Sequence, residues 1–205
     1  MARYAHVVFD IDGTLVDTQR AVLTGLQDTM KALAGREMSY EELLFSFGIP
    51  GEATLKILGI EDTKAGILEW NAHIRKYREF VDLFPGVEAL FGALDGVKIG
   101  IVTSKAVFEY EEEPSLGRIR HKVDVAVCAD HTEKHKPEPE PLLKYMELTG
   151  AKPDEVLYIG DSKYDEMCAH AAGVDFALAT WGATDLTLPA EWKPAEPMEI
   201  ANIVK

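Results

Sequence analysis

Five short runs of apolar, largely β-branched residues recur along the chain, and helical patterns separate most of them. Most of these runs are apolar throughout rather than alternating with polar residues, which is typical of strands buried on both faces of a sheet. Alternating strands and helices predict right-handed βαβ units, so we expect an α/β fold with a parallel five-stranded sheet flanked by helices. The predicted strands are 6–10, 97–103, 123–128, 155–160 and 174–179.

The interval between the first two predicted strands differs from the rest of the chain. Residues 16–82 show no convincing strand pattern, and their 67 residues are more than a crossover connection needs. We therefore predict a small helical subdomain that is inserted after the first strand and closes over the strand ends. Ser39 and Glu42 have the spacing of a capping box at the start of its second helix. The predicted helices of this subdomain are 17–34, 40–46, 51–58 and 62–80.

The predicted domain organisation has three segments. Residues 1–15 carry the first strand of the core, residues 16–82 form the helical cap domain, and residues 83–205 complete the core. Hinges are expected at 14–18 and 81–85, where the chain passes between core and cap. The predicted helices of the core are 86–94, 106–120, 138–149, 163–172 and 197–204.

The acidic composition limits the partners that we expect. The 21 basic and 35 acidic residues give a formal net charge of −14. Nucleic acids and anionic membranes are bound by clustered Lys and Arg, so we expect neither a nucleic acid nor a membrane as a partner. No apolar run reaches the length of a membrane span, and no signal-peptide pattern precedes the first acidic residue. Cys128 and Cys168 have no metal-type spacing, so we expect buried free thiols in a reducing cytoplasm. The expected assembly is a monomer or a homodimer.

Polar residues are concentrated where the predicted strands end. Ligands bind at the carboxyl ends of the strands in open parallel sheets, so these residues are the first candidates for a functional site. The segment DIDGT follows the first strand, TSK follows the second, and GDS follows the fourth. Four carboxylates, one lysine and one threonine are expected to converge there: Asp10, Asp12, Asp161, Asp165, Lys136 and Thr103.

The charge of this predicted cluster indicates what it binds. Four carboxylates and one lysine sum to −3, and buried like charges are costly unless they are paired or hold a cation. An oxygen-rich site of this kind suits Mg²⁺, which also bridges to phosphate oxygens. With Mg²⁺ the sum is −1, and one protonated carboxyl brings it near zero. The sequence thus predicts a Mg²⁺ site and a carboxyl group that can act as a general acid.

Four motifs, in order, carry a family resemblance. They are DIDGTLVDT at 10–18, IVTSK at 101–105, KPEPEPLL at 136–143 and YIGDSKYD at 158–165, the last followed by AAGV. With this order and spacing, nearly the whole chain resembles the phosphatase branch of the haloacid dehalogenase (HAD) superfamily, and in particular its phosphoglycolate-phosphatase-like group. The resemblance implies a Rossmann-like HAD core of five parallel strands with an inserted small α-helical cap domain.

The resemblance implies a role for each acid of the cluster. Asp10 would be the nucleophile that forms an aspartyl-phosphate, and Asp12 would be the general acid and then the general base. The expected Mg²⁺ ligands are the carboxylates of Asp10 and Asp161 and the backbone carbonyl of Asp12. Asp165 would orient metal-bound waters or Lys136. The acid at position 12 favours phosphoryl transfer over dehalogenation, because the haloacid branch lacks an acid there.

The same resemblance implies a set of phosphate-binding residues. The Thr103 hydroxyl and the Ser104 backbone N–H would bind phosphoryl oxygens, and Lys136 would offset the charge of Asp10 and of the transferred group. Gly13 would let the chain turn sharply behind the acid pair.

Other residues near these motifs have simpler interpretations. Asp161 and Asp165 could also cap a helix N-terminus. Lys105 is interpreted as a solvated loop residue, and His131 and His135 as part of a polar loop that leads to Lys136, because no third metal ligand is near. In the cap, Arg20, Arg75 and Arg78 are interpreted as helical surface residues. A loop that could reach the substrate is expected at Gly48, Ile49, Pro50 and Gly51.

The expected function is therefore a Mg²⁺-dependent phosphatase that hydrolyses a small phosphorylated metabolite through Asp10. By resemblance, phosphoglycolate is the first candidate substrate. The alternatives with the same fold are a sugar-phosphate mutase of the β-phosphoglucomutase type, a pyrophosphatase and a nucleotidase. An alternative of another class is a non-catalytic phosphoacceptor or binding module. The sequence does not select among the phosphorylated substrates.

Overall fold

The computed structural model describes residues 3–47 and 51–204, and it divides into two compact units. One unit is formed by Met1–Val16 and Leu83–Lys205, and the other by Asp17–Asp82. The second unit is thus an insertion in the sequence of the first. Two short strands, β2 (Val16–Asp17) and β3 (Asp82–Leu83), pair where the chain passes between the units.

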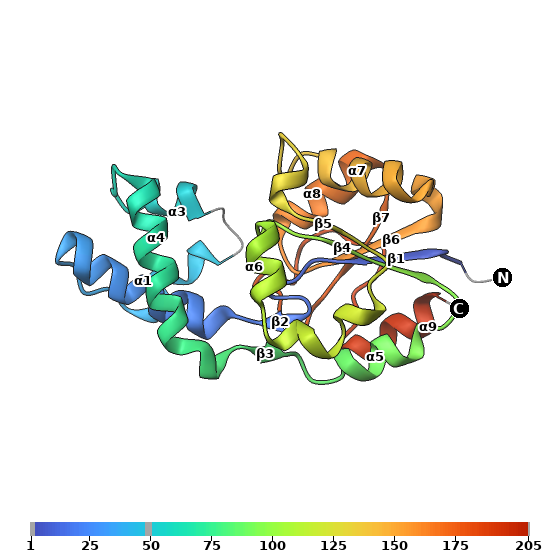
Figure 1. The fold of residues 1–205 in the computed structure, drawn as a ribbon, viewed down its shortest axis with the longest axis horizontal. Helices are drawn as coiled ribbons and strands as arrows, with labels where there is room; N and C mark the ends of the chain where they lie inside the picture. The colour runs from blue at the N-terminus through green and yellow to red at the C-terminus, as the bar shows by residue number, and fades with distance from the viewer. Residues whose placement is uncertain (1–2, 48–50, 205) are drawn as a thin grey trace. The chain divides into compact units, whose positions relative to one another are not determined.

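The first unit is built on a parallel five-stranded sheet with the order β5-β4-β1-β6-β7, which confirms the predicted α/β fold (Figure 1). Because β1 is central, the residues that follow it lie between the ends of β4 and β6. The middle of the sheet is buried on both faces, which explains the continuous apolar runs in the sequence. The strands are β1 (His6–Phe9), β4 (Lys98–Val102), β5 (Val125–Val127), β6 (Val156–Gly160) and β7 (Asp175–Leu178).

Helices cover both faces of this sheet: α7 (Glu140–Thr149) and α8 (Lys163–Ala172) on one face, α5 (Val87–Ala93) and α9 (Ile200–Val204) on the other (Figure 1). Under α7 and α8 lies a core that includes Tyr145, Tyr158 and Phe176. Short 3-10 turns complete the unit at Ser115–Arg118, Arg120–Lys122, Ala129–His131, Pro153–Glu155 and Pro197–Glu199.

The second unit consists of helices packed on an apolar core of their own. Its helices are α1 (Gln19–Ala34), α2 (Tyr40–Leu43), α3 (Gly51–Ile57) and α4 (Thr63–Ile74), with 3-10 turns at Leu44–Ser46 and Arg75–Phe80. Leu26, Met30 and Trp70 are among the buried residues of this core. The predicted capping box is confirmed, because Ser39 and Glu42 each accept a hydrogen bond from the other's backbone N–H.

Three secondary-structure predictions were wrong in detail. The helix predicted over 106–120 is α6 (Val107–Glu112) followed by 3-10 turns, because Pro114 has no N–H to donate and Glu113 before it is extended. The helix predicted over 62–80 ends as an α-helix at Ile74, and Tyr77 has non-helical dihedral angles. The interval predicted to lack strands includes the two short strands at its ends.

Cys128 and Cys168 are both buried and unpaired, as predicted. Burial raises the pKa of the Cys128 thiol to about 11 and that of Cys168 to about 12, which keeps both protonated near neutral pH. Within the residues that the structure describes, no helix is both long enough and apolar enough to cross a membrane.

Candidate active site

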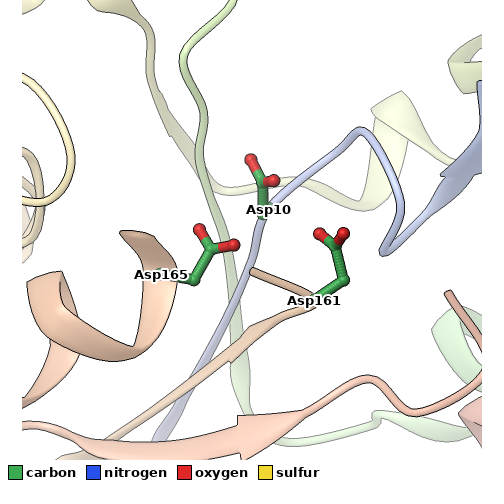
Figure 2. A group of neighbouring side chains, drawn as sticks. All are labelled: Asp10, Asp161 and Asp165. Atoms are coloured by element: carbon green, nitrogen blue, oxygen red, sulfur yellow. The ribbon is translucent and has the colours of Figure 1, made fainter. Parts of the chain in front are cut away.

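Three aspartates meet at the carboxyl edge of the sheet in the first unit. Asp10 follows β1, Asp161 follows β6, and Asp165 lies in the first turn of α8 (Figure 2). All three are buried, and one carboxylate oxygen of each lies within 4.8 Å of one from the other two. The sheet order explains this convergence, because β6 is the direct neighbour of β1 and the backbone N–H of Asp10 donates to the carbonyl of Ile159 (2.9 Å).

Lys136 lies among these carboxylates and is itself buried. Its Nζ is 2.9 Å from Asp10 Oδ1 and 2.6 Å from Asp165 Oδ1. Burial alone would lower the pKa of Lys136, but the two carboxylates outweigh it and raise the pKa, so the side chain is a cation at neutral pH. The site therefore holds a fixed positive charge against the Asp10 carboxylate.

Asp165 has hydrogen-bond donors on both carboxylate oxygens. Oδ1 faces Lys136 and the hydroxyl of Tyr158, and Oδ2 accepts from the backbone N–H of Ser162 (3.1 Å) and its hydroxyl (2.5 Å). Burial would raise the pKa of Asp165, but Lys136 and the other donors lower it. The capping interpretation is confirmed, because Asp165 completes the capping box of α8, and the same carboxylate also pairs with Lys136.

The negative charges of Asp10 and Asp161 are balanced by fewer donors and cations than that of Asp165. Burial, reinforced by the neighbouring carboxylates, raises the pKa of Asp10 to about 7 in spite of Lys136, and it raises the pKa of Asp161 well above its ordinary value. Among the described residues, the one side chain that donates to Asp161 is Thr14, at 3.2 Å from Oδ1. A divalent cation would stabilise two buried carboxylates with so few donors, and their all-oxygen ligand set fits Mg²⁺.

The turn after β1 is shaped to hold these acids. Gly13 has φ +77°, and a Cβ at this position would collide with the Asp161 carboxylate. A hydrogen bond also stabilises the turn, because Trp181 Nε1 donates to the carbonyl of Thr14 (2.8 Å). Only glycine allows this conformation and this close approach to Asp161.

The residues after β4 lie beside this turn, at the end of a strand that neighbours β1. Thr103 is buried, and its backbone N–H continues the pairing with β5 by donating to Val127 (3.0 Å). Ser104 is exposed. Interpreting Lys105 as a solvated loop residue was wrong: its Nζ lies 3.0 Å from Asp12 Oδ1, and its side chain is 19% exposed.

Tyr158 belongs to the site, although no role was predicted for it from the sequence. Its buried hydroxyl accepts from Lys136 (3.3 Å) and lies 2.9 Å from Asp165 Oδ1 and 3.0 Å from the carbonyl of Val102. The sequence feature that could have indicated this role is a tyrosine inside an otherwise apolar strand. A buried tyrosine hydroxyl needs a hydrogen-bond partner, so it indicates polar residues nearby.

We expect Tyr158→Phe to lower kcat by about tenfold to a hundredfold, because Lys136 and Asp165 lose a shared partner and hydrogen bonds to charged groups contribute ~1.5–3 kcal/mol. Steady-state kinetics checks this. The matched control is Tyr145→Phe, which removes a buried hydroxyl that contacts His6 (3.1 Å) outside the site. Equal activity losses in the two variants would contradict a role for Tyr158 in positioning Lys136.

A second expectation concerns Asp161→Asn, which removes one buried negative charge and keeps an acceptor for Thr14. Without metal, the variant should unfold at a higher urea concentration than the wild type. Mg²⁺ at about 100 times its Kd should stabilise the wild type by ~2.7 kcal/mol and the variant far less. Urea unfolding with EDTA and with Mg²⁺ measures both effects, with the exposed Asp154→Asn as the control. Equal stabilisation of the two proteins by Mg²⁺ would contradict this metal site.

The structure gives other contacts for several residues that the sequence singled out. His131 Nδ1 accepts from the backbone N–H of Cys128 (3.0 Å), and His135 is exposed. Arg20 stacks on the ring of Phe80 within the second unit, at 3.6 Å from the ring centroid. The predicted cap loop lies mostly outside the described residues, which omit Gly48, Ile49 and Pro50; Gly51 is the first residue of α3.

Comparisons with known proteins agree with this geometry. Residues 7–179 match the family model described as haloacid dehalogenase-like hydrolase. A relative from Caldanaerobacter subterraneus, provisionally named pyrophosphatase PpaX, is 31% identical over 92% of this chain and 87% of its own. A Lactobacillus plantarum structure, provisionally named a phosphoglycolate phosphatase, has 31% identity and a TM-score of 0.90 over 98% of this chain and 99% of that chain. A haloacid dehalogenase-like hydrolase structure from Bacteroides fragilis, also provisionally named, has 28% identity and a TM-score of 0.84 over 96% and 99%.

The parallel sheet, the acid cluster at its edge and these matches define a class of hydrolases that have a Rossmann-like parallel sheet and an inserted helical unit. The chain belongs to the haloacid dehalogenase-like hydrolase family, and it is an enzyme of that family. The resemblance drawn from its motifs is confirmed.

Proposed function

We propose that the protein is a Mg²⁺-dependent phosphatase that transfers the phosphoryl group of a small metabolite to Asp10 and then to water. The observation that carries this proposal is the ion pair of Lys136 with Asp10, fixed from the other side by Asp165. An aspartate held against a buried lysine is oriented to act as a nucleophile. Neighbouring residues would supply the general acid and the groups that bind the phosphoryl oxygens.

In the first step, an Asp10 carboxylate oxygen attacks phosphorus and the bond from phosphorus to the leaving-group oxygen breaks. The Asp12 carboxyl gives its proton to that oxygen. Asp12 suits this role because its side chain is 34% exposed and can reach a substrate, whereas that of Asp10 is 9% exposed. In the second step, Asp12 takes a proton from water, the water oxygen bonds to phosphorus, and Asp10 leaves as a carboxylate.

The remaining residues bind and neutralise the phosphoryl group. Lys136, the Thr103 hydroxyl and the Ser104 backbone N–H would contact its oxygens, and Gly13 would let the turn approach it closely. The Mg²⁺ ligands would be the carboxylates of Asp10 and Asp161 and the backbone carbonyl of Asp12. When bound, Mg²⁺ supplies charge neutralisation for the phosphoryl oxygens and lowers the cost of keeping Asp10 ionised.

The helical insertion is proposed to be the cap that selects the substrate, with domain boundaries at 1–15, 16–82 and 83–205. We expect a cytoplasmic enzyme, monomeric or homodimeric, that acts on a phosphorylated metabolite of the phosphoglycolate class. The name of the Lactobacillus plantarum protein supports this substrate. The second candidate is pyrophosphate, which the name of the Caldanaerobacter subterraneus relative favours.

The test is a screen of phosphorylated metabolites, nucleotides, sugar phosphates and pyrophosphate, with Mg²⁺ and with EDTA. We expect phosphate release from a few small phosphomonoesters, lost with EDTA and restored by Mg²⁺. Conversion of one sugar phosphate into its isomer without phosphate release would favour the mutase instead. A stably phosphorylated protein without turnover would favour the phosphoacceptor module.

A further inference from the structure

Lys105, the last residue of the motif segment 101–105, has no role in the proposed function. It follows β4, the strand that pairs with β1, and its backbone is fixed on both sides. Its N–H donates to Thr103 Oγ1 (3.2 Å) and its carbonyl accepts from the N–H of Ala129 (2.9 Å). Its backbone is therefore anchored at the edge of the sheet, and its ammonium is held by the ion pair with Asp12.

The charge around Lys105 is negative. Burial would lower its pKa, but Asp12 together with Glu113 and Glu109 raises it, so Lys105 is a cation at neutral pH. Its Nζ pairs with Asp12 (3.0 Å), whereas Lys136 pairs with Asp10 and Asp165. The site thus has one cation beside the nucleophile and a second cation beside the acid that meets the leaving group.

From this arrangement we propose that Lys105 is a specificity residue that selects substrates whose leaving group carries a negative charge of its own, such as a carboxylate or a second phosphate. The inference rests on the proposed function, because it takes Asp12 as the residue that protonates the leaving-group oxygen. With Asp12 in that role, an ammonium 3.0 Å from its carboxylate would lie on the leaving-group side of the phosphorus.

The donor capacity of lysine supports this role. An ammonium has three N–H donors, so Lys105 can hold Asp12 and contact a substrate anion at the same time. The carboxylates whose negative charge acts on Lys105 are those of Asp12, Glu113 and Glu109, and without this cation their charge would oppose an anionic leaving group beside Asp12. Lys105 therefore turns a region that repels such a group into one that binds it.

The test compares two esters of the same length, 2-phosphoglycolate and 2-hydroxyethyl phosphate, which differ by a carboxylate in place of a neutral alcohol. With Mg²⁺, the wild type should have the higher kcat/KM for phosphoglycolate. In Lys105→Met, the ratio of the two kcat/KM values should fall by about tenfold or more, since a charge-assisted contact is lost. Lys105→Arg should keep most of the ratio, and the control Lys122→Met, an exposed site, should keep all of it.

A binding measurement separates this inference from the proposed function. Calorimetry on Asp10→Asn with Mg²⁺ should give tighter binding of phosphoglycolate than of 2-hydroxyethyl phosphate, and adding Lys105→Met should remove that preference. Equal affinities in Asp10→Asn, or an unchanged ratio after the Lys105 substitution, would overturn the inference whether or not either ester is hydrolysed. Full activity of Asp10→Asn would instead overturn the proposed nucleophile.

Discussion

Replacing Asp10 with Asn is expected to lower kcat by about four orders of magnitude or more, because the amide cannot accept a phosphoryl group and nucleophile removal has effects of this size in other hydrolases. The substitution keeps the shape of the side chain and leaves Lys136 paired with Asp165 at 2.6 Å. The variant should therefore stay folded. Phosphate release from the best substrate of the screen, measured with Mg²⁺, checks the prediction.

The matched control is Asp154→Asn, which makes the same chemical change at an exposed position outside the site. It should keep wild-type kinetics. Far-ultraviolet circular dichroism and the urea midpoint show whether Asp10→Asn is folded. A folded Asp10→Asn protein with activity near that of the wild type would exclude Asp10 as the nucleophile.

Asp12→Asn is expected to have the second largest effect, and the size should depend on the leaving group. For an alkyl phosphate, kcat/KM should fall by about 10²–10⁴, since the alkoxide needs the proton that Asp12 supplies. For p-nitrophenyl phosphate the loss should be smaller, because p-nitrophenolate leaves without a proton. Initial rates on the two esters measure the difference.

Mg²⁺ affinity is the control for Asp12→Asn. The ligand expected from this residue is its backbone carbonyl, so the shift in the urea midpoint on adding Mg²⁺ should be close to that of the wild type. Equal losses of kcat/KM for both esters would argue against general acid catalysis by Asp12. Loss of the Mg²⁺ effect would contradict the carbonyl as the ligand.

The elements that were predictable from the sequence are those with a local signal. Continuous apolar runs located the five core strands, and Gly35 with φ +63° ends α1 where the helical pattern stops. The helix predicted over 106–120 was too long, because Pro114 removes one backbone donor and α6 ends at Glu112.

The site was predictable where its residues lie at strand ends, and less so where a role depends on a distant partner. Asp10 and Asp161 follow adjacent strands, so the rule for parallel sheets brings them together. The prediction for Lys105 was wrong because its ion-pair partner, Asp12, follows the neighbouring strand β1 and is far away in the sequence. Tyr158 was missed because its hydroxyl acquires its role only from Lys136 and Asp165, which other segments supply.

The most direct test of the central claim is to trap the phosphoryl group on the enzyme. Wild-type protein with Mg²⁺ and its best substrate is quenched within the first turnover and treated with borohydride, which reduces an acyl phosphate to the alcohol. Peptide mapping should then find homoserine at position 10 and aspartate at position 12. Modification at another residue, or none despite a burst of product, would contradict a covalent intermediate on Asp10.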